Sequence, residues 1–291
     1  MNVIPSTSVT SISRDYLRNG ELIAEALGRP ATVGLYLPAP VPDETYRDEF
    51  GFVFLPDGSV GPFYVSMGNI LQTLWRRHPD PANCHLDTMT VLQEFAGSDL
   101  AGRALAVGTY NALSASLYRS SGFEPPDRKP NSGLSETAQR SLVGMVGYFC
   151  PLVDRLTAGG HKVLVLERSP ERIPERDAVS VTTEPGDLRH CSMVVCTAST
   201  LINDSLEEIL EATDGKSDLE LIGPSGSGAP DPLLTRGVAG VGGILFADHS
   251  QLTRQLDLGE SWGSAGRKYQ LDRASYPGLR QLLRRLSIIR M

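Results

Sequence analysis

The sequence has no long hydrophobic run, few cysteines and no excess of basic residues, and each absence excludes a class of protein. No apolar run reaches 18 residues, so no membrane-spanning helix is predicted. The 27 Lys and Arg residues are outnumbered by 34 Asp and Glu residues, which argues against general nucleic-acid binding. The four cysteines lack framework spacing, and the N-terminal segment lacks the pattern of a signal peptide. We therefore expect a cytoplasmic protein that binds neither nucleic acid nor membrane.

Two phosphate-binding motifs are missing as well. The sequence contains no P-loop, and Gly144-x-x-Gly147 reproduces only part of the G-x-G-x-x-G dinucleotide fingerprint. The residues that follow, Phe149-Cys150-Pro151, would crowd a pyrophosphate. A tightly bound NAD is therefore disfavoured, and an NAD(P)-dependent oxidoreductase is kept only as the weaker alternative.

The second half of the chain alternates short apolar runs with helical patterns. Strands are predicted near 141–149, 161–167, 194–198, 219–222 and 238–246. Helices are predicted over 151–160, from 203 or 204 onward, over 248–256 and over 276–291. Because such alternation is typical of a parallel sheet, we predict a Rossmann-like α/β domain over 126–291. The leucine face of the last helix is compatible with a homodimer, and equally with docking on its own chain.

The first half mixes both patterns without this alternation. Helices are predicted over 11–27, 62–77 and 102–117, strands over 33–37 and 50–55, and either state over 89–95. A segment rich in proline and glycine, 120–139, predicts a domain boundary. We therefore expect a smaller α+β domain over 1–125 in front of the Rossmann-like domain.

In an open parallel sheet, ligands bind outside the carboxyl ends of the strands. This rule selects four segments that directly follow apolar runs: Gly147-Tyr148-Phe149, Glu167, Thr197 to Asn203, and Pro224 to Gly228. We predict that they line one ligand-binding cleft. The alternative is that these loops are small and polar only because they must turn and cap helices.

Glu167 is the acid that suggests a nucleoside. It ends the second predicted strand, 20 positions after Gly147, where an acid can accept hydrogen bonds from a ribose. A ligand with a ribose but no pyrophosphate, such as S-adenosylmethionine, fits this pattern. The alternative is a solvated strand end, or an ion pair with Arg168 or Arg172.

The segment after the third strand is rich in hydroxyl groups. Thr197, Ser199, Thr200 and Asn203 could bind a carboxylate or an amine, although Asn203 fits a helix N-cap equally well. Ser225 is either a ligand contact or a turn former. No base is near it in the sequence, so nucleophilic catalysis by a serine is disfavoured.

Two Cys-His neighbours, Cys84-His85 and His190-Cys191, raise the question of a metal site. Neither pair has the spacing that lets two ligands from one turn converge on an ion. Buried thiols and surface histidines are the preferred interpretation, and no metal ligand is assigned.

Four runs taken together identify a resemblance. They are VGYFCPLVDRL (146–156), VLVLERSPER (163–172), CTASTLINDSLEEIL (196–210) and IGPSGSGAPDPLLTRGVAGVGGILFAD (222–248). They resemble the heavy-metal chelation family, whose members have largely unknown function and pair an enolase-N-terminal-like α+β domain with a Rossmann-like domain. The likeness covers most of 135–270, and GTYNALSASL (108–117) matches more loosely.

The resemblance implies a cleft between the two domains. Carried over by position, that cleft includes Asn111, Thr197, Thr200, Asn203, Pro224 and Ser225. The chain departs from the family pattern at Ala198, where members often have glycine, and in a longer loop after the second strand.

The preferred hypothesis is an enzyme, a transferase or lyase that uses S-adenosylmethionine or a related amino-acid-bearing nucleoside. It would serve in specialised-metabolite or metallophore biosynthesis. Near the reacting end we expect Asn111, Tyr148 and Asn203. The remaining ligand contacts predicted are Gly147, Phe149, Glu167, Thr197, Ser199, Thr200, Pro224 and Ser225. The alternative is a non-catalytic protein that binds a metal chelate or metallophore.

Overall fold

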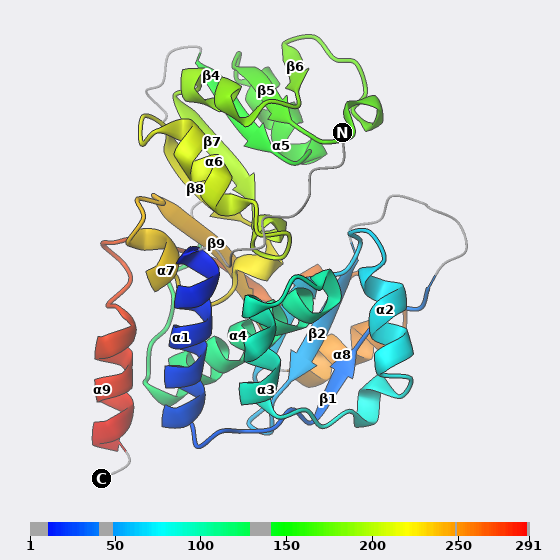
Figure 1. Ribbon diagram of the computed structural model, residues 1–291, viewed down its shortest axis with the longest axis vertical. Coiled ribbons are helices and arrows are strands. Elements are labelled where there is room, and N and C mark those ends of the chain that lie inside the picture. Colours follow the sequence, from blue (N-terminus) through cyan, green and yellow to red (C-terminus); the bar gives the residue numbers. More distant parts are fainter. Residues whose placement is uncertain (1–10, 41–48, 129–140, 248, 290–291) are drawn as a thin grey trace.

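The computed structural model describes residues 11–40, 49–128, 141–247 and 249–289, and these residues form two sheets with flanking helices (Figure 1). The first half of the chain contains α1 (Ser11–Ala26), β1 (Gly34–Tyr36), β2 (Phe50–Phe54), β3 (Val60–Tyr64), α2 (Ile70–Arg77), α3 (Thr88–Leu92) and α4 (Leu100–Ser120). Its strands form an antiparallel sheet in the order β1-β2-β3. The predicted α+β character of this half is confirmed.

The second half builds the larger sheet. Its strands are β4 (Leu142–Val146), β5 (Lys162–Leu166), β6 (Val179–Thr182), β7 (Met193–Thr197), β8 (Asp218–Ile222), β9 (Gly240–Leu245) and β10 (Arg267–Leu271). Its helices are α5 (Cys150–Ala158), α6 (Leu206–Thr213), α7 (Asp231–Leu234), α8 (His249–Asp257) and α9 (Leu279–Ile289).

The strand order of this sheet is β10-β9-β8-β7-β4-β5-β6. All neighbours are parallel except β10, which runs antiparallel to β9. The chain therefore winds outward from β4 to β6, returns to β7 beside β4, and winds outward in the other direction. This is the Rossmann order with one added antiparallel edge strand, and it confirms the predicted fold class.

Three strands escaped prediction. The predicted helix over 62–77 is wrong over 62–69, because β3 extends to Tyr64 and α2 begins only at Ile70. Pro62 is tolerated there because β3 is an edge strand and needs no N–H on its outer side. β6 is short and half exposed, and β10 alternates apolar and polar residues around Tyr269 and Leu271 without a continuous apolar run. Most of the predicted boundary 120–139 lies outside the described residues or at the end of α4.

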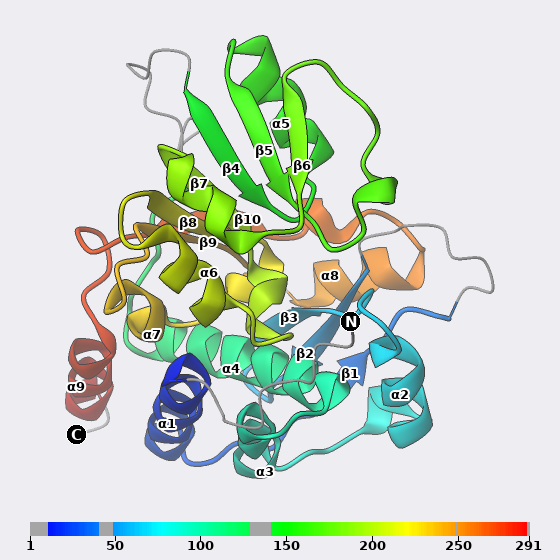
Figure 2. The ribbon, with the colours of Figure 1, turned by 45° about the horizontal axis from the view of Figure 1, so that its top comes forward.

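α4 occupies the centre of the molecule and is buried along most of its length (Figure 2). It packs against β3, α1 and α3, and its small residues allow a close approach. A Cβ on Gly61 of β3 would lie 1.9 Å from the carbonyl oxygen of Gly108 in α4. Only glycine permits this spacing between strand and helix.

Apolar contacts join the two halves. One hydrophobic cluster contains Phe52 and Val60 from the small sheet together with Ile244 from β9 and Phe246 directly after it. The division at residue 125 stays a prediction. The leucine face of α9 is buried near α1 and α4, so it gives no argument for the predicted homodimer. In the described ranges, no helix is long and apolar enough to cross a bilayer.

Arg103 of α4 is a buried cation at the junction of the halves, with 3% of its surface exposed. Its guanidinium donates to the carbonyl oxygens of Phe95 (2.7 Å), Ile202 (2.8 Å) and Leu201 (3.1 Å) and to the Ser13 hydroxyl (2.9 Å), and it pairs with the Asp204 carboxylate (2.8 Å). A planar fork of five N–H donors can serve more acceptors at once than the three donors of an ammonium. Arg103 thereby holds the loop after β7 against α1 and α4.

Replacing Arg103 with methionine should lower the free energy of unfolding by about 3 kcal/mol or more, because buried acceptors lose their donors. The matched control is Lys216→Met, since the Lys216 side chain is 66% exposed and pairs with the exposed Asp214. That control should stay within about 0.5 kcal/mol of wild type in urea denaturation. An Arg103 variant as stable as the control would contradict this role.

Candidate functional site

The carboxyl ends of β4 and β7 meet at the point where the strand order reverses. Gly147 follows β4 with a φ of 77°, and its N–H donates to the carbonyl oxygen of Leu166 at 3.1 Å. A Cβ on Gly147 would lie 3.2 Å from Cγ2 of Thr197, which ends β7. The positive φ and the close neighbour explain the glycine, and they bring two predicted site residues together.

The turn between β4 and α5 has few free N–H groups. The N–H of Phe149 donates to Sδ of Met145 at 3.4 Å, and the N–H groups of Leu152 and Val153 both donate to the Phe149 carbonyl at 2.9 Å. Pro151 has no N–H. A diphosphate cradle needs several free N–H groups at such a helix start, and this turn does not offer them.

A cysteine, an arginine and a tyrosine gather beside this turn. Cys150 is exposed, and Nη2 of Arg176 lies 3.1 Å from its Sγ. Arg176 also pairs with Asp154, and its guanidinium lies 5.9 Å from the centre of the Tyr148 ring. Burial raises the pKa of Tyr148, and the nearby Arg176 opposes that shift. Arg176 was missed from the sequence because it comes from the irregular loop before β6.

Glu167 lies at the carboxyl end of β5, as predicted, and is half-buried. Its Oε1 accepts the backbone N–H groups of Arg168 at 2.8 Å and Ser169 at 3.3 Å. The bond to Arg168 therefore uses the backbone and not the guanidinium. Neither bond uses Oε2, which leaves one carboxylate oxygen for another donor.

The hydroxyl-rich loop after β7 divides into an outer and an inner part. Oγ1 of Thr197 and Oγ of Ser199 lie 3.0 Å apart, and both residues are half-buried. Thr200 is 2% exposed, and its hydroxyl donates to the Thr197 carbonyl at 2.7 Å. Oδ1 of Asn203 accepts the hydroxyl of Ser205 at 2.6 Å, and Ser205, not Asn203, is the N-cap residue of α6.

Asn111 and Ser225 lie in the interior, at 1% and 2% exposure. The amide of Asn111 donates to the carbonyl oxygens of Pro62 (2.8 Å) and Ser225 (3.0 Å). Oγ of Ser225 accepts the N–H of Tyr64 at 3.0 Å. Pro224 is half-buried at the start of the same loop. These bonds join the loop after β8 to β3 and α4, so the predicted ligand role of both polar residues stays a prediction.

Nine of the eleven predicted residues fall into two groups, whereas Asn203 and Pro224, both half-buried, belong to neither. Those at the ends of β4, β5 and β7 share one edge of the sheet and retain some exposure: Gly147, Tyr148, Phe149, Glu167, Thr197 and Ser199. We call this group the switch-point site. Asn111, Thr200 and Ser225 are interior residues; Asn111 and Ser225 connect the two halves of the chain, whereas Thr200 bonds within its own loop.

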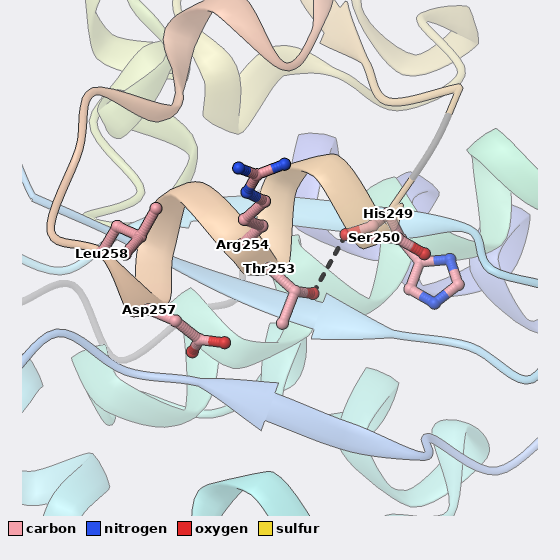
Figure 3. Close-up of a pocket in the computed structure, with 6 residues that line it drawn as sticks. All are labelled: His249, Ser250, Thr253, Arg254, Asp257 and Leu258. Atoms are coloured by element: carbon pink, nitrogen blue, oxygen red, sulfur yellow. Dashed lines mark hydrogen bonds between the residues drawn. The ribbon is translucent and has the colours of Figure 1, made fainter.

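Two hollows lie elsewhere. One of about 530 Å³ runs along α8 and is lined only by that helix and the residue after it, as Figure 3 shows: His249, Ser250, Thr253, Arg254, Asp257 and Leu258. The other, of about 460 Å³, lies between the loop 170–176 and β6 and includes Arg176. Neither is lined by a residue of the switch-point site.

The two Cys-His neighbours have different surroundings. Nδ1 of His85 donates to the Thr32 carbonyl at 3.0 Å, whereas Sγ of Cys84 lies 3.3 Å from Nδ1 of His78. Cys191 is buried, and burial raises its pKa to about 11. Among the residues that the structure describes, no group of three or more His, Cys, Asp or Glu side chains could hold a metal ion.

Comparisons with known proteins agree with this fold. Residues 132–274 match the DUF364 family, described as "Putative heavy-metal chelation". The resemblance found in the four sequence runs is thereby confirmed. A search of curated proteins gives no match.

Two solved structures share the fold over nearly their whole length. A DUF364 protein of unknown function from Pyrococcus horikoshii has a TM-score of 0.64 at 17% identity, covering 88% of this chain and 99% of its own. One from Desulfitobacterium hafniense DCB-2 has a TM-score of 0.62 at 16% identity, covering 89% and 99%. At such identities the likeness shows the fold alone.

Gly147→Ala should destabilise the protein by about 1–2 kcal/mol, because an L side chain is strained at this φ and meets Thr197. Gly186→Ala is the control, since among the described atoms none lies within 4 Å of its added Cβ. Denaturation of both variants checks this. Equal stability of the two variants would show that the turn does not need glycine.

An alkylating reagent should modify Cys150 before the other three thiols, because Cys150 is exposed while Cys191 and Cys196 are buried. Burial also raises the pKa of Cys196 to about 12, which keeps its thiol protonated. Timed labelling of the native protein with peptide mapping measures the order. Faster modification of Cys191 or Cys196 would contradict the described packing.

Proposed function

We propose that the chain is an enzyme that binds an amino-acid-bearing nucleoside of the S-adenosylmethionine class at the switch-point site, and acts on it as a transferase or lyase. The observation that carries the proposal is the position of Glu167. It ends the strand next to β4 in a Rossmann-ordered sheet, with one carboxylate oxygen not used by its own loop. An acid in that position suits a ribose.

The N–H groups at the start of α5 favour this ligand class over a dinucleotide. Because Leu152 and Val153 already donate to Phe149, and Pro151 has no N–H, a pyrophosphate would find few donors. A nucleoside joined to an amino acid needs no such cradle. Its ribose can pair with Glu167, and its amino-acid end can reach the hydroxyl groups of Thr197 and Ser199.

The chain's own residues would act mainly by positioning. S-adenosylmethionine supplies an electrophilic carbon beside its sulfonium. Tyr148 presents a phenol whose pKa is raised by burial, so it stays neutral and can donate a hydrogen bond. The paired hydroxyls of Thr197 and Ser199 orient polar groups of the substrate. Positioning of this kind accounts for large rate effects without an acid–base pair.

The interior residues have a supporting role in this proposal. Asn111 and Ser225 hold the loop after β8 against β3, and Arg103 holds the loop after β7. Asn203 orders the turn into α6 through Ser205. They keep the walls of the site fixed relative to Glu167, and they need not touch the ligand.

A protein that binds a metal chelate is the alternative, and the family description favours it. Such a chelate would have to bring its own ligands, because the described residues contain no group of three metal-binding side chains. Metal analysis of the purified protein separates the two ideas, since the nucleoside proposal requires no metal.

Isothermal titration with S-adenosylmethionine should show binding that Glu167→Gln weakens by about tenfold or more, because a charge-assisted bond to the ribose is lost. Glutamine keeps an oxygen for the Arg168 and Ser169 N–H groups, so the loop should survive. Glu171→Gln, in the same loop and exposed, is the control and should bind like wild type. No binding by wild type, or equal affinity of both variants, would refute the proposal.

A further inference from the structure

A thiol and an imidazole that are separate in the sequence meet on the first half of the chain. His78 is the C-cap residue of α2, and its N–H donates to the Leu74 carbonyl at 2.8 Å. The chain then turns through a short 3₁₀ helix, Pro81–Asn83, and returns Cys84 to the same place. Sγ of Cys84 lies 3.3 Å from Nδ1 of His78.

The loop that carries Cys84 is held on both sides. The Thr32 hydroxyl donates to the Cys84 carbonyl at 2.9 Å and accepts the N–H of Leu86 at 2.8 Å. On the other side, a Cβ on Gly34 would lie 2.5 Å from the carbonyl oxygen of Ala82, so the loop packs directly on β1. The sulfur therefore sits on a backbone that is fixed relative to α2.

Both side chains are also reachable from solvent. Cys84 and His78 are each half-buried, in contrast to the fully enclosed Cys191 and Cys196. A thiolate and a neutral imidazole together form a donor pair that soft d¹⁰ cations prefer.

We propose that His78 and Cys84 form a two-donor site for a soft, thiophilic cation, for which Cu(I) is the probe. This site lies in the first half of the chain and is independent of the switch-point site and of the function proposed for it.

The donor spacing suits adjacent corners of a tetrahedral ion. With bonds of about 2.3 Å to sulfur and about 2.0 Å to nitrogen, donors 3.3 Å apart subtend about 100° at a shared ion. Binding displaces the thiol proton to solvent, as metal ligation by cysteine requires. The remaining positions are open to water or a small ligand. Zn²⁺ usually needs three or four protein donors, and no third His, Cys, Asp or Glu completes the group in the described ranges.

The test is anaerobic titration of the full-length protein with Cu(I) in competition with a colorimetric chelator, following thiolate-to-copper charge-transfer absorption. Wild type should bind one equivalent, and Cys84→Ser and His78→Gln should each weaken binding by about tenfold or more. Cys150→Ser and His85→Gln are the matched controls and should bind like wild type. Zn²⁺ should not remain bound after passage over a chelator.

A second experiment uses only the wild-type protein, so its result does not depend on whether a variant folds. Cu(I) should protect Cys84, and leave Cys150 open, in alkylation mapped by mass spectrometry. The proposal is overturned if wild type does not compete for Cu(I), if binding is lost in Cys150→Ser, if Cys84 is not protected, or if Zn²⁺ is retained stoichiometrically.

Discussion

One buried guanidinium determines how the two halves of this protein meet. Arg103 projects from the central helix α4 and binds carbonyl groups of Leu201 and Ile202, in the loop that follows β7. The free-energy cost of removing such a cation from water is offset only if nearly all its N–H groups find acceptors. In addition to these two carbonyls, the guanidinium contacts the Phe95 carbonyl, the Ser13 hydroxyl and the Asp204 carboxylate. Two further buried contacts, from Asn111 and Tyr64 to Ser225, act on the loop after β8 in the same way.

This docking decides which part of the sheet can bind a ligand. The loops after β7 and β8 lie at carboxyl ends where an open α/β sheet would bind its ligand, yet much of their polar surface contacts α4 and β3. The part of the sheet edge that is left for a ligand is formed by Gly147, Tyr148, Glu167, Thr197 and Ser199. The proposed site therefore lies at the reversal of strand order between β4 and β7, where the topology of such folds leads one to expect a ligand.

The sequence predicts the features that depend on local pattern. The alternating strands and helices, and Glu167 at the end of β5, follow from short segments and fixed spacings. Features that depend on tertiary contacts could not be predicted. Pro62 looks like part of a helix until β2 is placed beside it, and the partner of Cys84 is His78, which only the turn at Pro81–Asn83 reveals. The interior partners of Asn111 and Ser225 could not be predicted either, because they lie far away in the sequence.

Ligand binding at the switch-point site can be measured by hydrogen–deuterium exchange of the full chain with and without S-adenosylmethionine. If the ligand occupies the switch-point site, backbone exchange slows in peptides covering 146–153, 166–170 and 197–200, and is unchanged along α8 and α9. Absence of any change, or slowing confined to the α8 surface, would contradict the account.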